Sequence, residues 1–296
     1  MITAVEAQVT GTIAHWSFDT PSLSIDGGSG NITGAGDSTG NHNMSVGANV
    51  GGLNGVSGTR NSTAIPGSAS VSGRFGQGLT LTGNGTSGNF MMFPNLTELM
   101  AASAPAGYTV SFWVNTTVGP VNRFAYGISD WGTAVLPGTG AGEFNYGFAL
   151  ERSPADTTDL RSQVRSAAAT DLYQRPVDLG ANPFLDGNWH MLTWTYNTVS
   201  GQLITYVDGT QRDTFDATAG QIQNSASQIG VLGLKGDSGN FVNSSVIFDD
   251  AWVFGGAATP DEVQGLFNAN AVPEPSSWAL AGVGALILIN FRRRSA

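Results

Sequence analysis

The sequence contains no cysteine, a single lysine and few charged residues of either sign. Without cysteine there can be no disulfide framework, no thiolate nucleophile and no cysteine-ligated zinc. Charged residues make up only 11% of the 296 residues, whereas 41 residues are glycine and 41% of the chain is apolar. This balance favours an exported β-sandwich with many loops, of a size that a single domain can reach, over a helical cytosolic enzyme.

Basic side chains are also scarce relative to acidic ones. The chain has 22 aspartates and glutamates against 12 lysines and arginines, which gives a formal net charge of −10. An acidic surface repels phosphate backbones and attracts cations. The charge balance therefore argues against a nucleic-acid partner and agrees with cation binding.

The clearest structural pattern is a pair of β-rich runs, Trp189–Tyr196 and Gln202–Val207. Aspartate–glycine turns flank the pair at Asp186-Gly187 and Asp208-Gly209. Aromatic and β-branched runs bounded by such turns predict an antiparallel hairpin. Large apolar side chains lie on both faces of each predicted strand. We therefore expect a central hairpin that is covered on both faces.

Other segments predict further strands and one helix. Thr259-Pro-Asp-Glu262 has the capping-box pattern with proline at the first helical position, which predicts a helix to about Asn268. Tyr108–Asn115 alternates strictly, and eleven glycines between residues 27 and 58 exclude a helix there. The remaining predicted strands are 12–19, a strand pair within 71–93 around a Gly-Asn-Gly turn, 124–131, 146–152, 160–165, 229–234 and 246–254, with long polar connections at 137–143 and 168–182.

Several of these segments together resemble one family. The Trp189-His190 hairpin ending in Tyr206-Val-Asp-Gly209, the Trp16-x-Phe18-Asp19 opening and Gly73-Arg-Phe-Gly-Gln-Gly-Leu79 resemble laminin-G-like domains of the concanavalin A-like superfamily. The resemblance implies an all-β, two-sheet antiparallel jelly-roll sandwich over residues 11–270. In it, Trp113, Trp189, Trp194 and the apolar residues of 246–254 are expected to line one core between the sheets.

The two ends of the chain are expected to lie outside the sandwich. Residues 1–10 are interpreted either as a disordered leader or as the remnant of a signal peptide cleaved near Val5-Glu-Ala7. After 271, a Pro-Glu-Pro motif precedes an apolar run and an arginine cluster. This tail comprises Pro273, Glu274 and Pro275, the run 278–289, and Arg292, Arg293 and Arg294.

The apolar run is short for a permanent membrane anchor. As a helix, the roughly 14 residues from Trp278 to Phe291 span about 21 Å, against a bilayer core of about 30 Å. The terminal arginines favour a cytoplasmic end, with the main body outside. The combination resembles the PEP-CTERM sorting tail, over residues 271–296. That resemblance implies a separate apolar tail helix, transient membrane insertion and processing by an exosortase-type enzyme in a Gram-negative-type envelope. A plain C-terminal anchor is the alternative.

The sequence lacks the acid pair of the superfamily's glycosidases. Retaining hydrolysis needs two carboxyl groups about 5 Å apart, as alternate positions on a strand provide. No two of the six glutamates lie within a few residues of each other in the sequence. His15 and His190 lie within apolar strands, where hydrogen-bonded imidazoles are expected rather than catalytic ones. We therefore expect no enzyme.

The resemblance implies a structural calcium ion that ties the first strand and its loop to the closing strand. The matching residues are Asp19, Asp37, Gly40, Asn41 and Asp249, with Asp250 as an alternative to Asp249. Carboxylates and carbonyls suit calcium, and Gly40 offers only its carbonyl. The alternative is that these residues serve ordinary turns.

Aromatic residues beside loops are candidates for stacking on sugar rings. Tyr126, Trp131 and Tyr146 have this position, although core packing claims most such side chains. The leading hypothesis is a non-catalytic adhesion or binding module of the cell envelope or polysaccharide matrix, with an extracellular glycan or envelope protein as partner. The alternatives are a glycan-processing enzyme with a noncanonical acid pair and a purely structural matrix protein.

Overall fold

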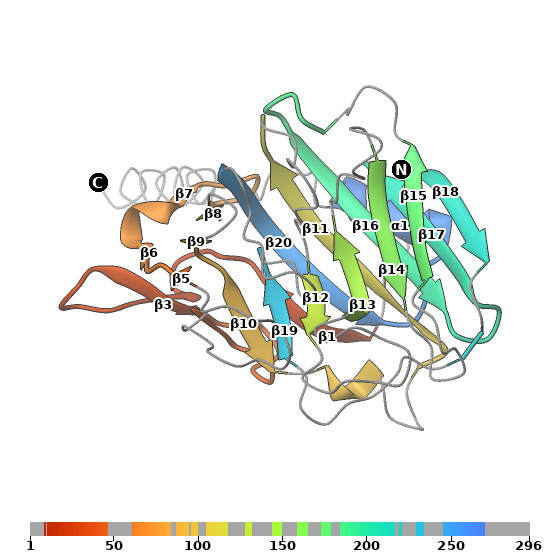
Figure 1. Cartoon of the computed structure of the whole chain (residues 1–296), viewed down its shortest axis with the longest axis horizontal. Helices are drawn as coiled ribbons and strands as arrows, with labels where there is room; N and C mark the ends of the chain where they lie inside the picture. The colour runs from red at the N-terminus through yellow and green to blue at the C-terminus, as the bar shows by residue number, and fades with distance from the viewer. Residues whose placement is uncertain are drawn as a thin grey trace, which may run out of the picture.

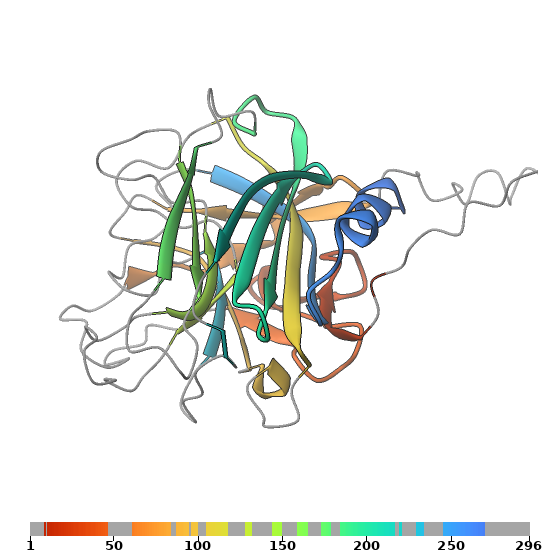
Figure 2. The same cartoon turned by 90° about the vertical axis from the view of Figure 1, so that its right-hand side faces the viewer.

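The computed structural model shows two antiparallel β-sheets that lie face to face, with a short helix on the outer side of one of them (Figures 1 and 2). This confirms the predicted sandwich. The described residues are 9, 11–46, 61–83, 87–94, 96–99, 105–117, 128–131, 144–149, 159–164, 173–178, 184–216, 219–220, 229–233 and 245–269. The predicted tail and most of the predicted leader therefore lie outside them.

In the first sheet the strand order is β18 (Thr210–Asp216), β17 (Gln202–Val207), β16 (Trp189–Asn197), β11 (Gly107–Asn115), β20 (Ser245–Gly255), β8 (Gln77–Thr82) and β7 (Ser70–Ser72), and β1 (Thr12–Trp16) also pairs with β20. In the second it is β15 (Tyr173–Asp178), β14 (Asp159–Val164), β13 (Phe144–Ala149), β12 (Ile128–Trp131), β19 (Ile229–Leu232), β10 (Met91–Pro94), β4 (Met44–Val46), β3 (Asn31–Ala35) and β2 (Leu23–Ile25), with β6 (Ile65–Pro66) on β3. The small elements are β5 (Asn61–Ser62), β9 (Ser87–Gly88), η1 (Gly67–Ala69), η2 (Thr97–Leu99) and α1 (Pro260–Ala269).

The predicted central hairpin is β16 and β17, and it continues into β18. Asp208 and Gly209 both have positive φ, of 52° and 73°, so they form the tight turn between β17 and β18. β18 was not predicted as a strand, because its sequence Thr-Gln-Arg-Asp-Thr-Phe-Asp is polar and mostly exposed. An edge strand needs little apolar surface, which hides it from a hydrophobic pattern.

The main core fills the space between the sheets. From the first sheet it receives Trp194 and Phe112, whose ring centroids lie 5.7 Å apart, and Phe248. From the second sheet it receives side chains such as Met91 and Leu232. These residues are fully buried, so they exclude water from the interface between the sheets.

A second apolar cluster covers the outer face of the first sheet. Trp113 and Met191 pack there with Val263 of α1, and the Phe267 ring stacks on Trp113 at 5.6 Å between centroids. The predicted single core for the three tryptophans is therefore wrong: Trp194 faces the other sheet, whereas Trp113 and Trp189 lie under α1. The register of β11 and β16 explains this. Val110 pairs with Trp194, and Trp113 pairs with Met191, three positions further along. Side chains alternate along a strand, so an odd separation puts the two pairs on opposite faces of the sheet.

Two further predictions have clear outcomes. The capping box is confirmed: the amide of Thr259 donates to Glu262 Oε2 at 2.8 Å, and the amide of Glu262 donates to Thr259 Oγ1 at 3.3 Å. The predicted strand pair within 71–93 closes only at its turn, where Gly83 and Gly88 form an antiparallel bridge, because β8 belongs to the first sheet and β10 to the second. The chain crosses between the sheets here, which a local turn pattern cannot distinguish from a hairpin. Among the described residues, no helix is long and apolar enough to span a bilayer.

Candidate functional site

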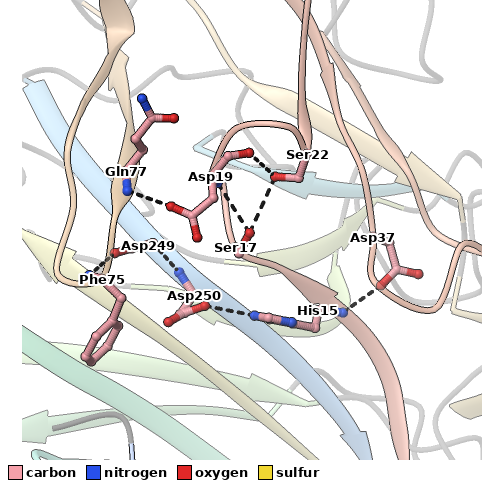
Figure 3. A network of polar contacts seen from close by, with 9 residues as sticks. All are labelled: His15, Ser17, Asp19, Ser22, Asp37, Phe75, Gln77, Asp249 and Asp250. Atoms are coloured by element: carbon pink, nitrogen blue, oxygen red, sulfur yellow. Dashed lines mark hydrogen bonds and ion pairs between the residues drawn. The ribbon is translucent and has the colours of Figure 1, made fainter. Parts of the chain in front are cut away.

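The loop between β7 and β8 joins two acidic residues that are 230 positions apart in the sequence (Figure 3). The amide of Gln77 donates to Asp19 Oδ1 at 2.7 Å, and the amide of Phe75 donates to Asp249 Oδ2 at 2.9 Å. The loop contains glycine where the carboxylates approach. A Cβ at Gly73 would lie 2.5 Å from Asp249 Oδ2, and one at Gly76 would overlap Asp19 Oδ1. The glycines therefore allow both acids to reach the backbone.

Asp249 is completely buried in β20. Burial raises the pKa of its carboxyl group to about 8, and the nearby charge of Asp250 adds to this rise. Backbone amide donors, including those of Phe75 and Asp250, oppose the rise without cancelling it. The side chain therefore holds a proton near neutral pH when no cation lies beside it.

Asp250 turns the opposite way and holds β1. It has a positive φ of 41° and sits where β20 shifts register against β11. Its Oδ1 lies 2.8 Å from Nε2 of His15, and the His15 ring stacks on Trp252 with 3.4 Å between centroids. The predicted hydrogen-bonded role of His15 is confirmed, and the contact ties the first strand to the closing strand.

Asp37 is buried in the loop after β3 and binds the backbone around it. Its carboxylate accepts the amides of His15 at 2.7 Å, His42 at 3.1 Å and Asn41 at 3.2 Å, and it also accepts the hydroxyl of Thr39. Burial acts to raise the pKa of Asp37, but hydrogen bonds from Thr39, His15 and His42 outweigh it and lower the pKa. Asp37 therefore organises its own loop as an anion.

The predicted calcium ligands are thus divided between two places. In the part of the chain that the structure describes, no three acidic or histidine side chains are grouped so that they could hold a metal ion. Asp19 and Asp249 both accept backbone amides from the segment between β7 and the start of β8. Their carboxylates are the kind of ligand that calcium prefers. Asp37 instead accepts amides of its own loop, to which Gly40 and Asn41 also belong, and the amide of His15. The part of these three residues in a calcium site stays a prediction. The role of the β7–β8 loop was missed, although the closely spaced glycines were visible in the sequence.

A cavity of ≈ 300 Å³ opens next to this network. It is lined by His15, Ser17, Pro21, Ser22, Gly36, Asp37 and Ser38. Its wall combines a flat imidazole ring with serine hydroxyls, which are groups that can contact a polyhydroxylated ligand.

The aromatic candidates for ligand binding lie on the second sheet. Trp131 is in β12 and Tyr146 is in β13, and these strands pair with each other. Tyr126 lies outside the described residues. Their role in binding stays a prediction.

A second polar cluster joins the two aspartate–glycine turns of the central hairpin. His190 places Nδ1 2.8 Å from Asp208 Oδ2 and Nε2 3.1 Å from Asp186 Oδ1. The hydrogen bond to Asp208 is the main cause that raises the pKa of His190, with Asp186 adding to it and burial opposing it. His190 is thus a structural, hydrogen-bonded imidazole, as predicted.

Comparison with known families gives two matches. Residues 84–264, more than half of the chain, match the model described as the concanavalin A-like lectin/glucanases superfamily. Residues 271–294 match the PEP-CTERM protein-sorting motif. This motif implies export to the bacterial envelope or beyond and processing by exosortase-type machinery. None of the curated proteins compared with the chain has a matching sequence.

Solved structures with a similar fold include toxin binding domains. The binding domain of Paraclostridial Mosquitocidal Protein 1 is 16% identical at a TM-score of 0.51, covering 88% of this chain and 52% of that one. Botulinum neurotoxin type C, described with two ganglioside molecules, is 13% identical at 0.53, covering 88% and 51%. The receptor-binding domain of the botulinum mosaic serotype C/D is 12% identical at 0.54, covering 88% and 51%. The chain spans about half the length of these structures, and at such identities the likeness establishes the fold alone.

Proposed function

The chain belongs to the concanavalin A-like lectin/glucanases superfamily, and on this basis we propose that it is an exported, non-catalytic module that binds a glycan or an envelope protein. The observation that carries the proposal is how three aspartates near the ends of the sandwich are used. Asp19, Asp37 and Asp249 each accept backbone amides and hold loops in place. Carboxylates used in this way stabilise the loops of a scaffold, and Asp37 also lines the cavity beside His15.

The proposed ligand is a glycan, bound by aromatic stacking. Trp131 and Tyr146 on the paired strands β12 and β13 are the first candidates, and the cavity beside His15 is the second. The ganglioside described with botulinum neurotoxin type C supports this choice by fold only. Sugar rings stack on aromatic faces, and hydroxyl groups beside them provide orientation.

A glycan array probed with the purified chain tests binding. The proposal expects a signal on a restricted set of glycans. If the second sheet binds the glycan, Trp131→Ala or Tyr146→Ala should remove this signal. If the cavity binds it, Ser38→Trp should remove the signal. Val199→Ala is the matched control, since Val199 is apolar, 74% exposed and in the β16–β17 turn. An array without any signal, together with no capture of envelope proteins, would leave the purely structural role.

We propose that the tail holds the chain in the cytoplasmic membrane of a Gram-negative-type bacterium until it is cleaved. The sorting motif and the arginine cluster support this orientation. Mass spectrometry of envelope or secreted material should find chains that lack Arg292, Arg293 and Arg294. Intact chains in that material would point to a plain anchor.

A structural calcium ion stays part of the proposal for this end of the sandwich. Asp19 and Asp249 would hold it, with backbone carbonyls and water completing the oxygen ligands. The excess of acidic residues supports cation binding in general. The ion would supply the positive charge that favours the ionised form of Asp249, which burial otherwise disfavours.

A further inference from the structure

Helix α1 and the sorting motif are close neighbours in the chain. The helix ends at Ala269, and only residues 270–272 precede Pro273. An extended chain covers at most about 3.6 Å per residue, so Pro273 lies within about 14 Å of Ala269 whenever α1 is docked. A protein interface covers roughly 800 Å² on each partner, which corresponds to a patch about 30 Å across and so exceeds this distance. An enzyme that holds the motif must therefore also meet the domain.

The packing of α1 keeps it docked on the first sheet. Val263 is completely buried, and Phe267 stacks on Trp113. The capping box fixes the start of the helix, and Gln264 lies against Gly209 of the β17–β18 turn. Undocking would expose the apolar cluster, so the docked helix is the form that the processing enzyme encounters.

The exposed side of α1 suits a protein partner better than a lipid surface. Asp261 and Asn268 are exposed, the first turn contains acidic residues, and the last turn contains no basic residue. Anionic lipids attract lysine and arginine clusters, which this helix lacks. A protein surface with complementary basic groups can pair with the acidic first turn.

We propose that the face of the domain formed by α1 is an interaction surface for the transpeptidase that cleaves the tail. This inference rests on the proposed function, in which the tail is a sorting signal. The enzyme reads the motif and the docked helix together. Chains whose sandwich has folded, and which present both, are then processed faster than chains in which α1 is loose.

The test compares the same charge change at two places and at two tail spacings. The full chain is produced in a host with an exosortase-type enzyme, and the rate of tail cleavage is followed by pulse-chase and mass spectrometry. Asp261→Lys alters α1, and Asp26→Lys makes the same change in the exposed β2–β3 turn, at the opposite end of the molecule from α1 in Figure 1. Each is also made with a Gly/Ser insertion of about 20 residues after Asn270, which spans about 25 Å on average.

We expect Asp261→Lys to slow cleavage at least about threefold at the natural spacing and to have no effect with the insertion. Asp26→Lys should match the unmodified chain at both spacings. The proposal is overturned if Asp261→Lys is cleaved as fast as the unmodified chain at the natural spacing. It is also overturned if the insertion does not relieve the slower cleavage of Asp261→Lys.

A second variant tests whether the helix acts in its docked form. Phe267→Ala removes the stacking on Trp113 and loosens the last turn of α1, so we expect slower cleavage. Faster cleavage would mean that α1 has to leave the sheet, and it would overturn the proposal. If the unmodified chain is not cleaved at all in a host that cleaves another PEP-CTERM protein, the proposed processing itself is refuted.

Discussion

Replacing Asp249 by asparagine should change how the stability of the domain depends on pH. Asp249 is completely buried, and burial raises the pKa of its carboxyl group to about 8, from an ordinary value near 4. Between these two values the folded chain holds a proton that the unfolded chain has lost. The free energy of unfolding therefore falls as the pH rises through this window.

The magnitude follows from the proton count. One proton bound more tightly by the folded state contributes at most about 1.4 kcal/mol per pH unit, hence up to about 5 kcal/mol between pH 4 and pH 8. A domain of this kind is stable by only about 5–15 kcal/mol in total. Asparagine cannot ionise, so Asp249→Asn removes this loss. It has one carbonyl oxygen for the amides of Phe75 and Asp250, and this costs about 1–3 kcal/mol at every pH.

Urea unfolding at pH 5, 6, 7 and 8 in the presence of a chelator measures the effect. At pH 5, Asp249→Asn should have the lower free energy of unfolding. With each rise in pH up to 8, the unmodified chain should lose stability relative to the variant, so the difference between the two should shrink or reverse. Asp261→Asn, in the exposed first turn of α1, is the control and should parallel the unmodified chain. Parallel curves for the unmodified chain and Asp249→Asn would refute the reasoning from burial.

The other predictions use the same chain. Calcium at a hundredfold excess over its Kd should stabilise the unmodified chain by about 2.7 kcal/mol and leave Asp19→Asn unchanged, and identical melting in calcium and chelator would disprove the site. Gly76→Ala should lower the free energy of unfolding in urea by about 3 kcal/mol or more, because the new Cβ meets Asp19. Gly40 has a similar φ but open space around it, so Gly40→Ala should cost only about 1–2 kcal/mol. Equal losses for the two variants would contradict the contact with Asp19. His190→Gln should remove a contribution to stability that is fully present below about pH 6.5 and is lost as the pH rises through the raised pKa of His190, so an unchanged pH profile in thermal melting would count against this cluster.

Much of the sandwich follows from patterns local in the sequence. The central hairpin has alternating apolar residues and aspartate–glycine turns, and Thr259 and Glu262 define the start of α1. The face to which each tryptophan belongs does not follow, because both faces of the central strands are apolar. Only the pairing of Val110 with Trp194 and the position of α1 separate Trp194 from Trp113.

The candidate site was predicted in part. The sequence indicated that Asp19 and Asp249 are important at the two ends of the sandwich, and they do share a loop. It did not reveal that Gly73 and Gly76 make room for them, since a loop that brings backbone amides to distant carboxylates has no periodic pattern. Asp37 was grouped with these acids by resemblance, yet its hydrogen bonds are mostly to its own loop and to His15.

The most direct test of the binding role is a calorimetric titration of the purified chain with the strongest glycan from the array, followed by recovery of that glycan. We predict saturable binding, loss of that binding on substitution at one of the two candidate surfaces, unchanged binding for Val199→Ala, and a glycan recovered intact. Cleaved glycan would show an enzyme, and absence of binding to every glycan and envelope protein tested would contradict the proposed function.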